Sequence, residues 1–111
     1  MSKKTDEFRL IFSQMLGRVF REIRESSGKS QEEIGRNADI NRITIGKWEN
    51  GKSRPDIYDL YRAIKEICPN QSIFWENVEK AFNPIFDDLD RAADRQKYQN
   101  YILGNKQKKL K

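Results

Sequence analysis

Hydrophobic residues recur at steps of three and four positions through most of the chain, which is the spacing of amphipathic helices. The first run predicts one helix over about residues 6–26, which Gly28 ends. Its apolar positions are Phe8, Ile11, Phe12, Met15, Leu16, Val19, Phe20 and Ile23. No stretch alternates between apolar and polar residues as a half-buried strand does, and no internal repeat is visible. The pattern therefore predicts an all-α fold.

Two short helices are predicted next. Ser30, with Glu33 three positions later, forms a capping box, the pattern that opens a helix. The inward-facing residues of this second helix are Ile34 and Ala38. Asp39 then falls in the turn, and Asn41 is expected to cap a third helix over residues 41–50. The order is therefore helix, turn, helix.

Two further helices are predicted later in the chain. Pro55 opens the fourth, where its missing N–H does no harm, and Asp56 suits the positive end of the helix dipole. Its predicted inner face consists of Ile57, Leu60, Tyr61, Ile64 and Ile67. Ser72 is expected to cap a fifth helix, which Pro84 interrupts. The apolar positions beyond the interruption are Ile85, Phe86, Leu89 and Ala92.

Length and composition limit the class of protein. A chain of 111 residues with 36% apolar and 35% charged residues fits one domain with an extension, and its core must be small. Because there is no histidine and only one cysteine, Cys68, we expect no metal site of the Cys/His type, no disulfide and no cofactor. Cys68 itself is interpreted as a packing residue rather than a redox sensor. The charged start has no apolar run behind it, so we expect a cytoplasmic protein without a signal peptide or membrane segment.

The net charge of +5 is unevenly distributed. Residues 97–111 contain five lysines and no acid, so this tail accounts for the whole excess and is interpreted as a solvated segment. Between residues 36 and 54, five basic residues face two acidic ones, whereas residues 55–96 contain nine acids and five bases. One basic stripe in a neutral remainder is typical of a protein that places one face on phosphate.

The third helix divides into two faces at about 100° per residue. Ile45 and Trp48 project together and are predicted to be buried, with Thr44 at their edge. The outward residues are Arg42, Ile43, Gly46, Lys47 and Asn50. A guanidinium, an ammonium and an exposed β-branched methyl group are the chemistry that reads guanine and thymine in the major groove. An ordinary solvated helix face remains the alternative interpretation.

Neighbouring residues favour the DNA-binding interpretation. Gln31 lies in the first turn of the second helix, where free backbone N–H groups favour a phosphate. Lys52 and Arg54 follow the third helix and are placed to contact the adjacent DNA backbone. Gly46 is interpreted as the position where the helix and the edge of the groove approach closely.

Residues 17–67 resemble the phage repressor and Cro helix-turn-helix family, also called XRE-type. The residues that carry the resemblance, over a little under half of the chain, are Leu16, Gly17, Arg21, Arg24, Ser30, Gln31, Glu32, Glu33, Ile34, Ile45, Trp48, Glu49, Asn50, Gly51, Lys52, Pro55 and Leu60. The resemblance implies a lambda-repressor-like bundle of about five helices, here with a C-terminal helical extension. Gly35 replaces the family's usual Ala, and Asp39 stands where a Gly is common, which suggests a less rigid turn.

The resemblance also implies roles for individual residues. Gln31 would contact a phosphate, and Arg24 would form a structural ion pair with Glu49. The implied base-reading positions are Arg42, Ile43 and Lys47, with Thr44 and Asn50 nearby. Lys52 and Arg54 keep the phosphate role inferred from their position.

The chain is divided into a DNA-binding domain (residues 6–68), a helical extension (69–95) and a basic tail (96–111). The aromatic residues of the extension are Phe74, Trp75, Phe82 and Phe86. They either complete the core against the first helix or form a dimer interface, and both are compatible.

The favoured function is a sequence-specific transcriptional regulator, a repressor or controller from a bacterium, phage or mobile element. It would bind a palindromic DNA operator as a homodimer. One alternative is an antitoxin that regulates its own operon and binds a toxin through the extension. A second alternative, of another class, is a protein-interaction module that binds no DNA. An enzyme is not expected, because the chain has no histidine, no glycine-rich phosphate loop and no paired carboxylates at a defined spacing.

Overall fold

The computed structural model describes residues 3–89. They form five helices and no strand, so the predicted all-α fold is confirmed for this part of the chain. The helices are α1 (Lys3–Ser26), α2 (Gln31–Ala38), α3 (Arg42–Glu49), α4 (Ile57–Ile67) and α5 (Gln71–Leu89). The predicted basic tail, residues 96–111, and the predicted end of the extension, residues 90–95, lie outside the described residues.

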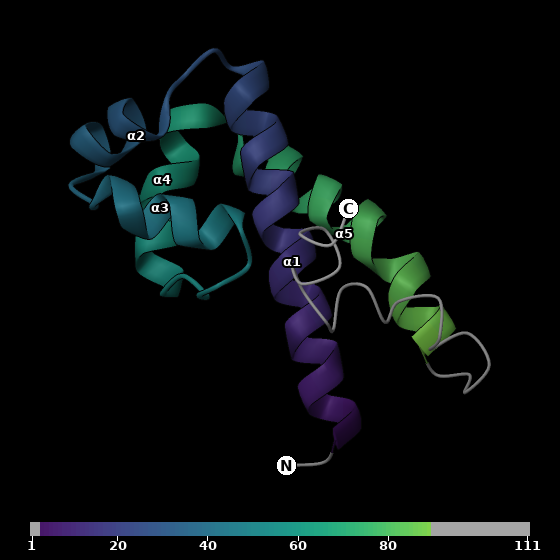
Figure 1. Cartoon of the computed structure of the whole chain (residues 1–111). Helices are drawn as coiled ribbons and strands as arrows, with labels where there is room; N and C mark the ends of the chain where they lie inside the picture. The colour runs from purple at the N-terminus through teal and green to yellow at the C-terminus, as the bar shows by residue number, and fades with distance from the viewer. Residues whose placement is uncertain (1–2, 90–111) are drawn as a thin grey trace, which may run out of the picture.

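α1 runs through both parts of the structure (Figure 1). Its C-terminal half packs against α3 and α4, and α2 packs on these two helices. α5 runs antiparallel to α1, from Phe20 toward the N-terminal end of α1. Phe8, near the start of α1, contacts Phe86, near the end of α5, with ring centroids 5.0 Å apart. Farther along, Phe12 contacts Phe82 at 4.9 Å. The aromatic residues of the extension thus cover the part of α1 that the other helices leave open.

The main core lies where α1, α3, α4 and α5 meet. Phe20 of α1 is 1% exposed and contacts the rings of both Trp48 and Phe74, at 6.0 and 6.3 Å. Cys68 is buried in the same cluster, where its thiol is a packing group. A smaller cluster of Ile11, Met15 and Ile85 continues the core toward the N-terminal end of α1.

The start and the inner face of α4 differ from the prediction. The helix begins at Ile57, and Asp56 is its N-cap, accepting hydrogen bonds from two backbone N–H groups at 2.9 and 3.2 Å. Ile57 is 73% exposed and Tyr61 50% exposed, so both were wrongly assigned to the core. Ile57 lies in the first turn, whereas Ala63 takes the place that Tyr61 was expected to fill on the buried side.

α5 begins earlier and runs farther than predicted. Asn70, not Ser72, caps it, because the Ser72 N–H donates to Asn70 Oδ1 at 3.0 Å. The helix also continues through Pro84, where an interruption was expected. Pro84 removes one helical hydrogen bond, but Phe82 and Ile85 on either side of it are anchored on α1. Packing on both sides outweighs the local preference of proline.

Candidate nucleic-acid interface

A side-chain cap opens each of α2 and α3, and Asp39 forms the turn between them. The Glu33 N–H donates to Ser30 Oγ at 3.0 Å, and the Ile43 N–H donates to Asn41 Oδ1 at 2.8 Å. Asp39 ends α2 in the left-handed conformation, with φ 57° and ψ 50°. Asp adopts this conformation more readily than most residues, so the turn forms without a glycine. Both predicted caps and the turn position are confirmed.

The two faces of α3 are separated as the sequence predicts. Ile45 is fully buried and Trp48 is 4% exposed, and both belong to the main core. The exposed residues are Arg42, Ile43, Lys47 and Asn50, while Thr44 and Gly46 are half-buried between the two faces. Asn50 is the C-cap rather than part of the helix, and its N–H donates to Gly46 O at 3.1 Å.

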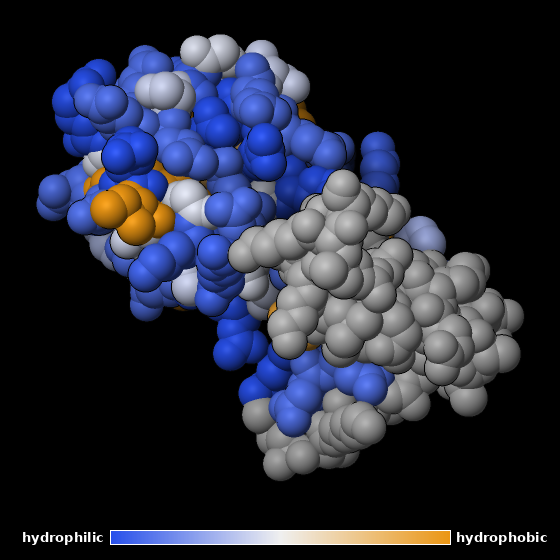
Figure 2. Space-filling view, viewed as in Figure 1, coloured by the Kyte–Doolittle hydropathy of each residue, from blue (hydrophilic) through white to orange (hydrophobic). Residues whose placement is uncertain are grey.

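Ile43 is unusual among the exposed residues of α3 because its side chain is apolar and 60% exposed. In Figure 2 the coloured surface on this side is mostly hydrophilic, with one prominent hydrophobic spot over the end formed by α2 and α3. An exposed isoleucine between Arg42 and Lys47 has no role in the core. Its methyl groups are available to contact the methyl group of a thymine.

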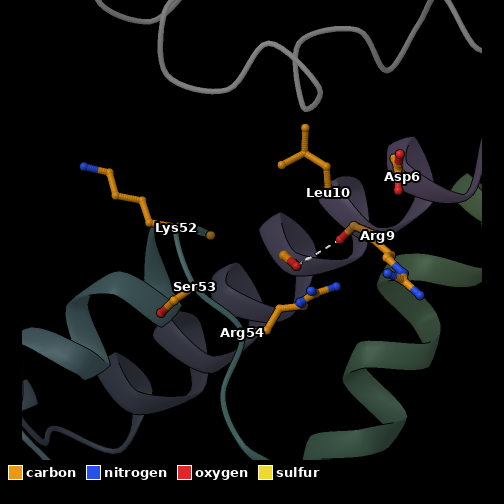
Figure 3. A pocket seen from close by; sticks show the side chains of 8 residues that line it. Asp6, Arg9, Leu10, Lys52, Ser53 and Arg54 are labelled. Carbon is orange, nitrogen blue, oxygen red and sulfur yellow. Dashed lines mark hydrogen bonds between the residues drawn. The ribbon is translucent and has the colours of Figure 1, made fainter. Parts of the chain in front are cut away.

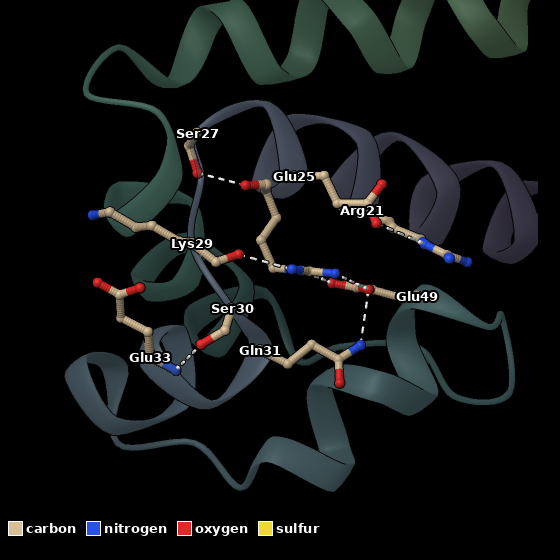
Figure 4. A network of polar contacts seen from close by, with 9 residues as sticks. Arg21, Glu25, Ser27, Lys29, Ser30, Gln31, Glu33 and Glu49 are labelled. Atoms are coloured by element: carbon tan, nitrogen blue, oxygen red, sulfur yellow. Dashed lines mark hydrogen bonds and ion pairs between the residues drawn. The ribbon is translucent and has the colours of Figure 1, made fainter.

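A buried polar network fixes α3 on α1 and α2 (Figure 4). Arg24 Nε and Nη2 donate to the two oxygens of the Glu49 carboxylate at 2.6 and 3.0 Å. Gln31 Nε2 donates to the same carboxylate at 2.9 Å, and Arg24 Nη1 donates to the Lys29 carbonyl at 2.8 Å. One carboxylate at the end of α3 is thus bound by the first two helices.

The Glu49 hydrogen bond raises the pKa of Arg24 above its ordinary value, although burial opposes this. The guanidinium therefore stays charged at every pH at which a protein is normally studied. Arg24 and Glu49 form the structural ion pair that the family resemblance implies. That resemblance did not indicate that Lys29 and Gln31 join it. Lys29 extends the network to α4, because its ammonium donates to the Glu66 carbonyl.

Two glycines allow backbones to touch next to this network. A Cβ on Gly17 would lie 2.1 Å from the Trp48 carbonyl oxygen, so α1 and α3 are in direct backbone contact there. A Cβ on Gly35 would lie 2.4 Å from the Ile40 carbonyl oxygen, within the turn. Gly35 therefore departs from the family's alanine because this turn leaves no room for a methyl group. The chain is closely packed at this turn, and the expected lower rigidity of the turn stays a prediction.

Gly46 is different from these two. A Cβ there would meet only the Gln31 side chain, at 3.6 Å, which is ordinary van der Waals contact. The protein itself has room for alanine at this position. The absence of a side chain at Gly46 is therefore not explained by packing among residues 3–89.

The predicted phosphate-binding residues lie around the C-terminal end of α3. Gln31 is half-buried beside Glu49, whereas Lys52 and Arg54 are exposed in the loop that follows α3. The Lys52 N–H donates to Lys47 O at 2.9 Å, and Gly51 takes a positive φ of 70°. This geometry turns the chain sharply and places the loop beside the end of α3.

The family comparison agrees with this geometry. Residues 20–66 match the sequence model of a helix-turn-helix family. This stretch is a helix-turn-helix domain. The resemblance drawn from the sequence is confirmed, and the domain belongs to a class that binds DNA and regulates transcription. The match covers the C-terminal part of α1 through most of α4, and it leaves out the N-terminal half of α1 and all of α5. A comparison with curated proteins found no match.

Two further findings concern residues 3–89. No helix in this range is both long and apolar enough to cross a membrane. Among the same residues, no group of three or more cysteine and acidic side chains is arranged to hold a metal ion.

Proposed function

We propose that the chain is a sequence-specific DNA-binding regulator that inserts α3 into the major groove. The observation that carries this proposal is the division of α3. Ile45 and Trp48 anchor one face in the core, while the opposite face leaves a basic, partly apolar surface that is exposed among residues 3–89. That surface matches the donors and apolar groups that distinguish base pairs in the major groove.

Each exposed side chain of α3 has a role under this proposal. Arg42 donates two hydrogen bonds to a guanine, Ile43 contacts a thymine methyl group, and Lys47 reaches a guanine or a phosphate. The remaining predicted readers, Thr44 and Asn50, lie at the edge of the same surface.

Phosphate contacts would hold α3 in register. Lys52 and Arg54 contact the backbone beyond the end of α3. Gln31 contributes from the first turn of α2, because its amide has a second N–H besides the one that Glu49 accepts. The Glu49 bond also orients the Gln31 side chain before DNA arrives, which lowers the entropy cost of the contact.

Regulators of this class commonly act as symmetric dimers on palindromic sites, and we propose the same here. The two copies of α3 would then lie about 34 Å apart, one turn of DNA. Repression or control of transcription in a bacterial or phage-infected cell follows from occupying such an operator.

Selection of bound sequences from a random duplex pool tests the proposal most directly. A palindromic motif with half-sites one helical turn apart would support it. Failure to enrich any sequence would contradict sequence-specific binding. Steep weakening with salt is also expected, because phosphate contacts release counterions. Binding whose affinity does not depend on salt concentration would favour the alternative of a protein-interaction module.

Two substitutions separate the proposed roles. Arg42→Ala should lose about 1–3 kcal/mol on the selected site and relax the preference at one base pair, because it removes a base contact. Lys52→Ala should weaken selected and random duplexes alike, because phosphate contacts carry no sequence information. Equal effects of both variants on both duplexes would contradict this assignment.

A further inference from the structure

A groove of about 380 Å³ lies between the N-terminal half of α1 and the loop after α3 (Figure 3). Its polar lining consists of Asp6, Arg9, Ser13, Lys52, Ser53 and Arg54. In Figure 3 the Arg54 side chain extends toward the side on which Arg9 lies, and Lys52 extends the other way. The volume equals that of about a dozen water molecules, so a tetrahedral anion fits with part of its hydration.

The charge around the groove favours an anion. Arg9, Lys52 and Arg54 contribute three positive charges, whereas Asp6 contributes one negative charge. Within residues 3–89, none of the three basic side chains forms an ion pair with a carboxylate. Arg9 and Arg54 present planar guanidinium groups, which match the oxygens of a phosphate.

The fold fixes both walls of the groove. On α1, Asp6, Arg9 and Ser13 recur at steps of three and four and therefore share one face. The Ser13 hydroxyl donates to the Arg9 carbonyl at 2.9 Å, so it is already used inside the helix. The loop after α3, which forms the opposite wall, packs closely against α1. A Cβ on Gly51 of this loop would lie 2.6 Å from the Gln14 side chain.

We propose that this groove binds a phosphate group, and that its source is the DNA backbone beside the site read by α3. The proposal rests on the proposed function and adds Arg9, from a part of α1 outside the helix-turn-helix match, to the contact surface. The loop wall is bonded directly to the end of α3 through the Lys52 N–H and Lys47 O. A phosphate in the groove would therefore lie next to the DNA that α3 occupies.

The test is a pair of substitutions with opposite expected effects. Arg9→Ala should weaken binding about fivefold to tenfold on selected and random duplexes alike, and should lower the slope of log K against log salt by about one. Asp6→Asn removes the opposing charge and should strengthen binding to both duplexes. Arg9 and Asp6 are exposed, so neither change removes a core contact.

Lys80→Ala is the matched control. It also removes one exposed positive charge, but Lys80 lies on α5 beside Glu22 and Asn77, away from the loop after α3. Its DNA affinity and salt slope should stay close to those of the wild type. An equal loss of DNA affinity in Arg9→Ala and Lys80→Ala would mean that only the total charge of the protein matters. That result would contradict a phosphate site in the groove.

Titration of the labelled wild-type chain with inorganic phosphate, against chloride at equal ionic strength, separates the two sources. If the wild type binds DNA, and Arg9→Ala and Asp6→Asn leave that binding unchanged, the backbone is not the source. A saturable shift of the Arg9 side-chain resonance would then assign the groove to a free phosphorylated molecule, and no shift would overturn the site altogether. If the wild type binds no duplex, the proposed function fails, and the same titration alone decides the groove.

Discussion

The two halves of α1 belong to regions that are held together in different ways. In the helix-turn-helix region, α2 and α3 have eight residues each and are oriented by one buried carboxylate, that of Glu49. In the hairpin formed by the N-terminal half of α1 and the nineteen-residue α5, rows of aromatic rings make the contacts. Both regions have an apolar core, but the helix-turn-helix region adds a buried network of directional hydrogen bonds to it.

This difference follows from what each region has to do. A helix that reads bases must be held at a defined angle, and hydrogen bonds weaken steeply when their geometry changes. Aromatic pairs accept several tilts, and the two ring pairs between the N-terminal half of α1 and α5 meet at interplanar angles of 60° and 85°. The hairpin therefore stabilises α1 through contacts that do not require one defined ring angle.

Loss of the Glu49 carboxylate is expected to have the largest effect. Glu49→Ala leaves the Arg24 guanidinium, whose side chain is 10% exposed, without its partner, and should lower the free energy of unfolding by about 3 kcal/mol. Urea unfolding followed by circular dichroism measures this. Glu25→Ala is the matched control, because its ion pair with Arg21 is more than half exposed and contributes at most about 0.5 kcal/mol. Similar losses in both variants would contradict a special role for the buried pair.

The backbone contact between α1 and α3 should come next. Gly17→Ala forces these helices apart, since the new methyl group would lie 2.1 Å from the Trp48 carbonyl oxygen, and about 2 kcal/mol of stability should be lost. Thermal and urea unfolding report the change. Glu22→Ala, at an exposed position of the same helix, should stay within about 0.5 kcal/mol of the wild type. An unchanged free energy of unfolding in Gly17→Ala would show that α1 and α3 can move apart without loss of stability.

A conservative change in the hairpin should be tolerated better. Phe82→Leu keeps most of the apolar volume against Phe12 and should lose only about 1 kcal/mol. DNA affinity, measured by fluorescence anisotropy on the selected duplex, should not change. A loss as large as that of Glu49→Ala would mean that the hairpin also requires one defined geometry.

The smallest effect on stability, and the one of opposite sign, is expected at Gly46. Gly46→Ala fits beside Gln31 and improves helix propensity, so the free energy of unfolding should rise by up to about 1 kcal/mol. If the edge of the DNA groove comes close to this position, affinity for both selected and random duplexes should fall in the same variant. Higher stability together with unchanged affinity would show that Gly46 does not face the DNA.

Local signals in the sequence were sufficient to predict the helix-turn-helix region. Side-chain caps and apolar spacing act over three or four residues, so Ser30, Asn41 and the buried pair Ile45 and Trp48 were identified without the fold. The uninterrupted α5 was not predicted, because Pro84 was judged by its local preference alone, without the contacts on α1 that hold both sides.

The polar sites were only partly predictable. The ion pair of Arg24 and Glu49 was expected from the family resemblance, but the Gln31 bond to the same carboxylate depends on how α2 lies across α3. Arg9 is separated from Lys52 by more than forty positions in the sequence, and the two residues line one groove because the loop after α3 packs against α1. Such meetings depend on tertiary packing, which no local pattern encodes.

Phe20 has a consequence for how the chain unfolds. Its ring contacts Trp48 in one region and Phe74 in the other, so neither region keeps an intact core when the other is lost. The two regions should therefore melt as one cooperative unit rather than as two. The chain contains two tryptophans, Trp48 in one region and Trp75 in the other. Replacing one tryptophan by Phe leaves the other as the fluorescence probe of its own region. The unfolding transitions measured in the two single-tryptophan variants should coincide.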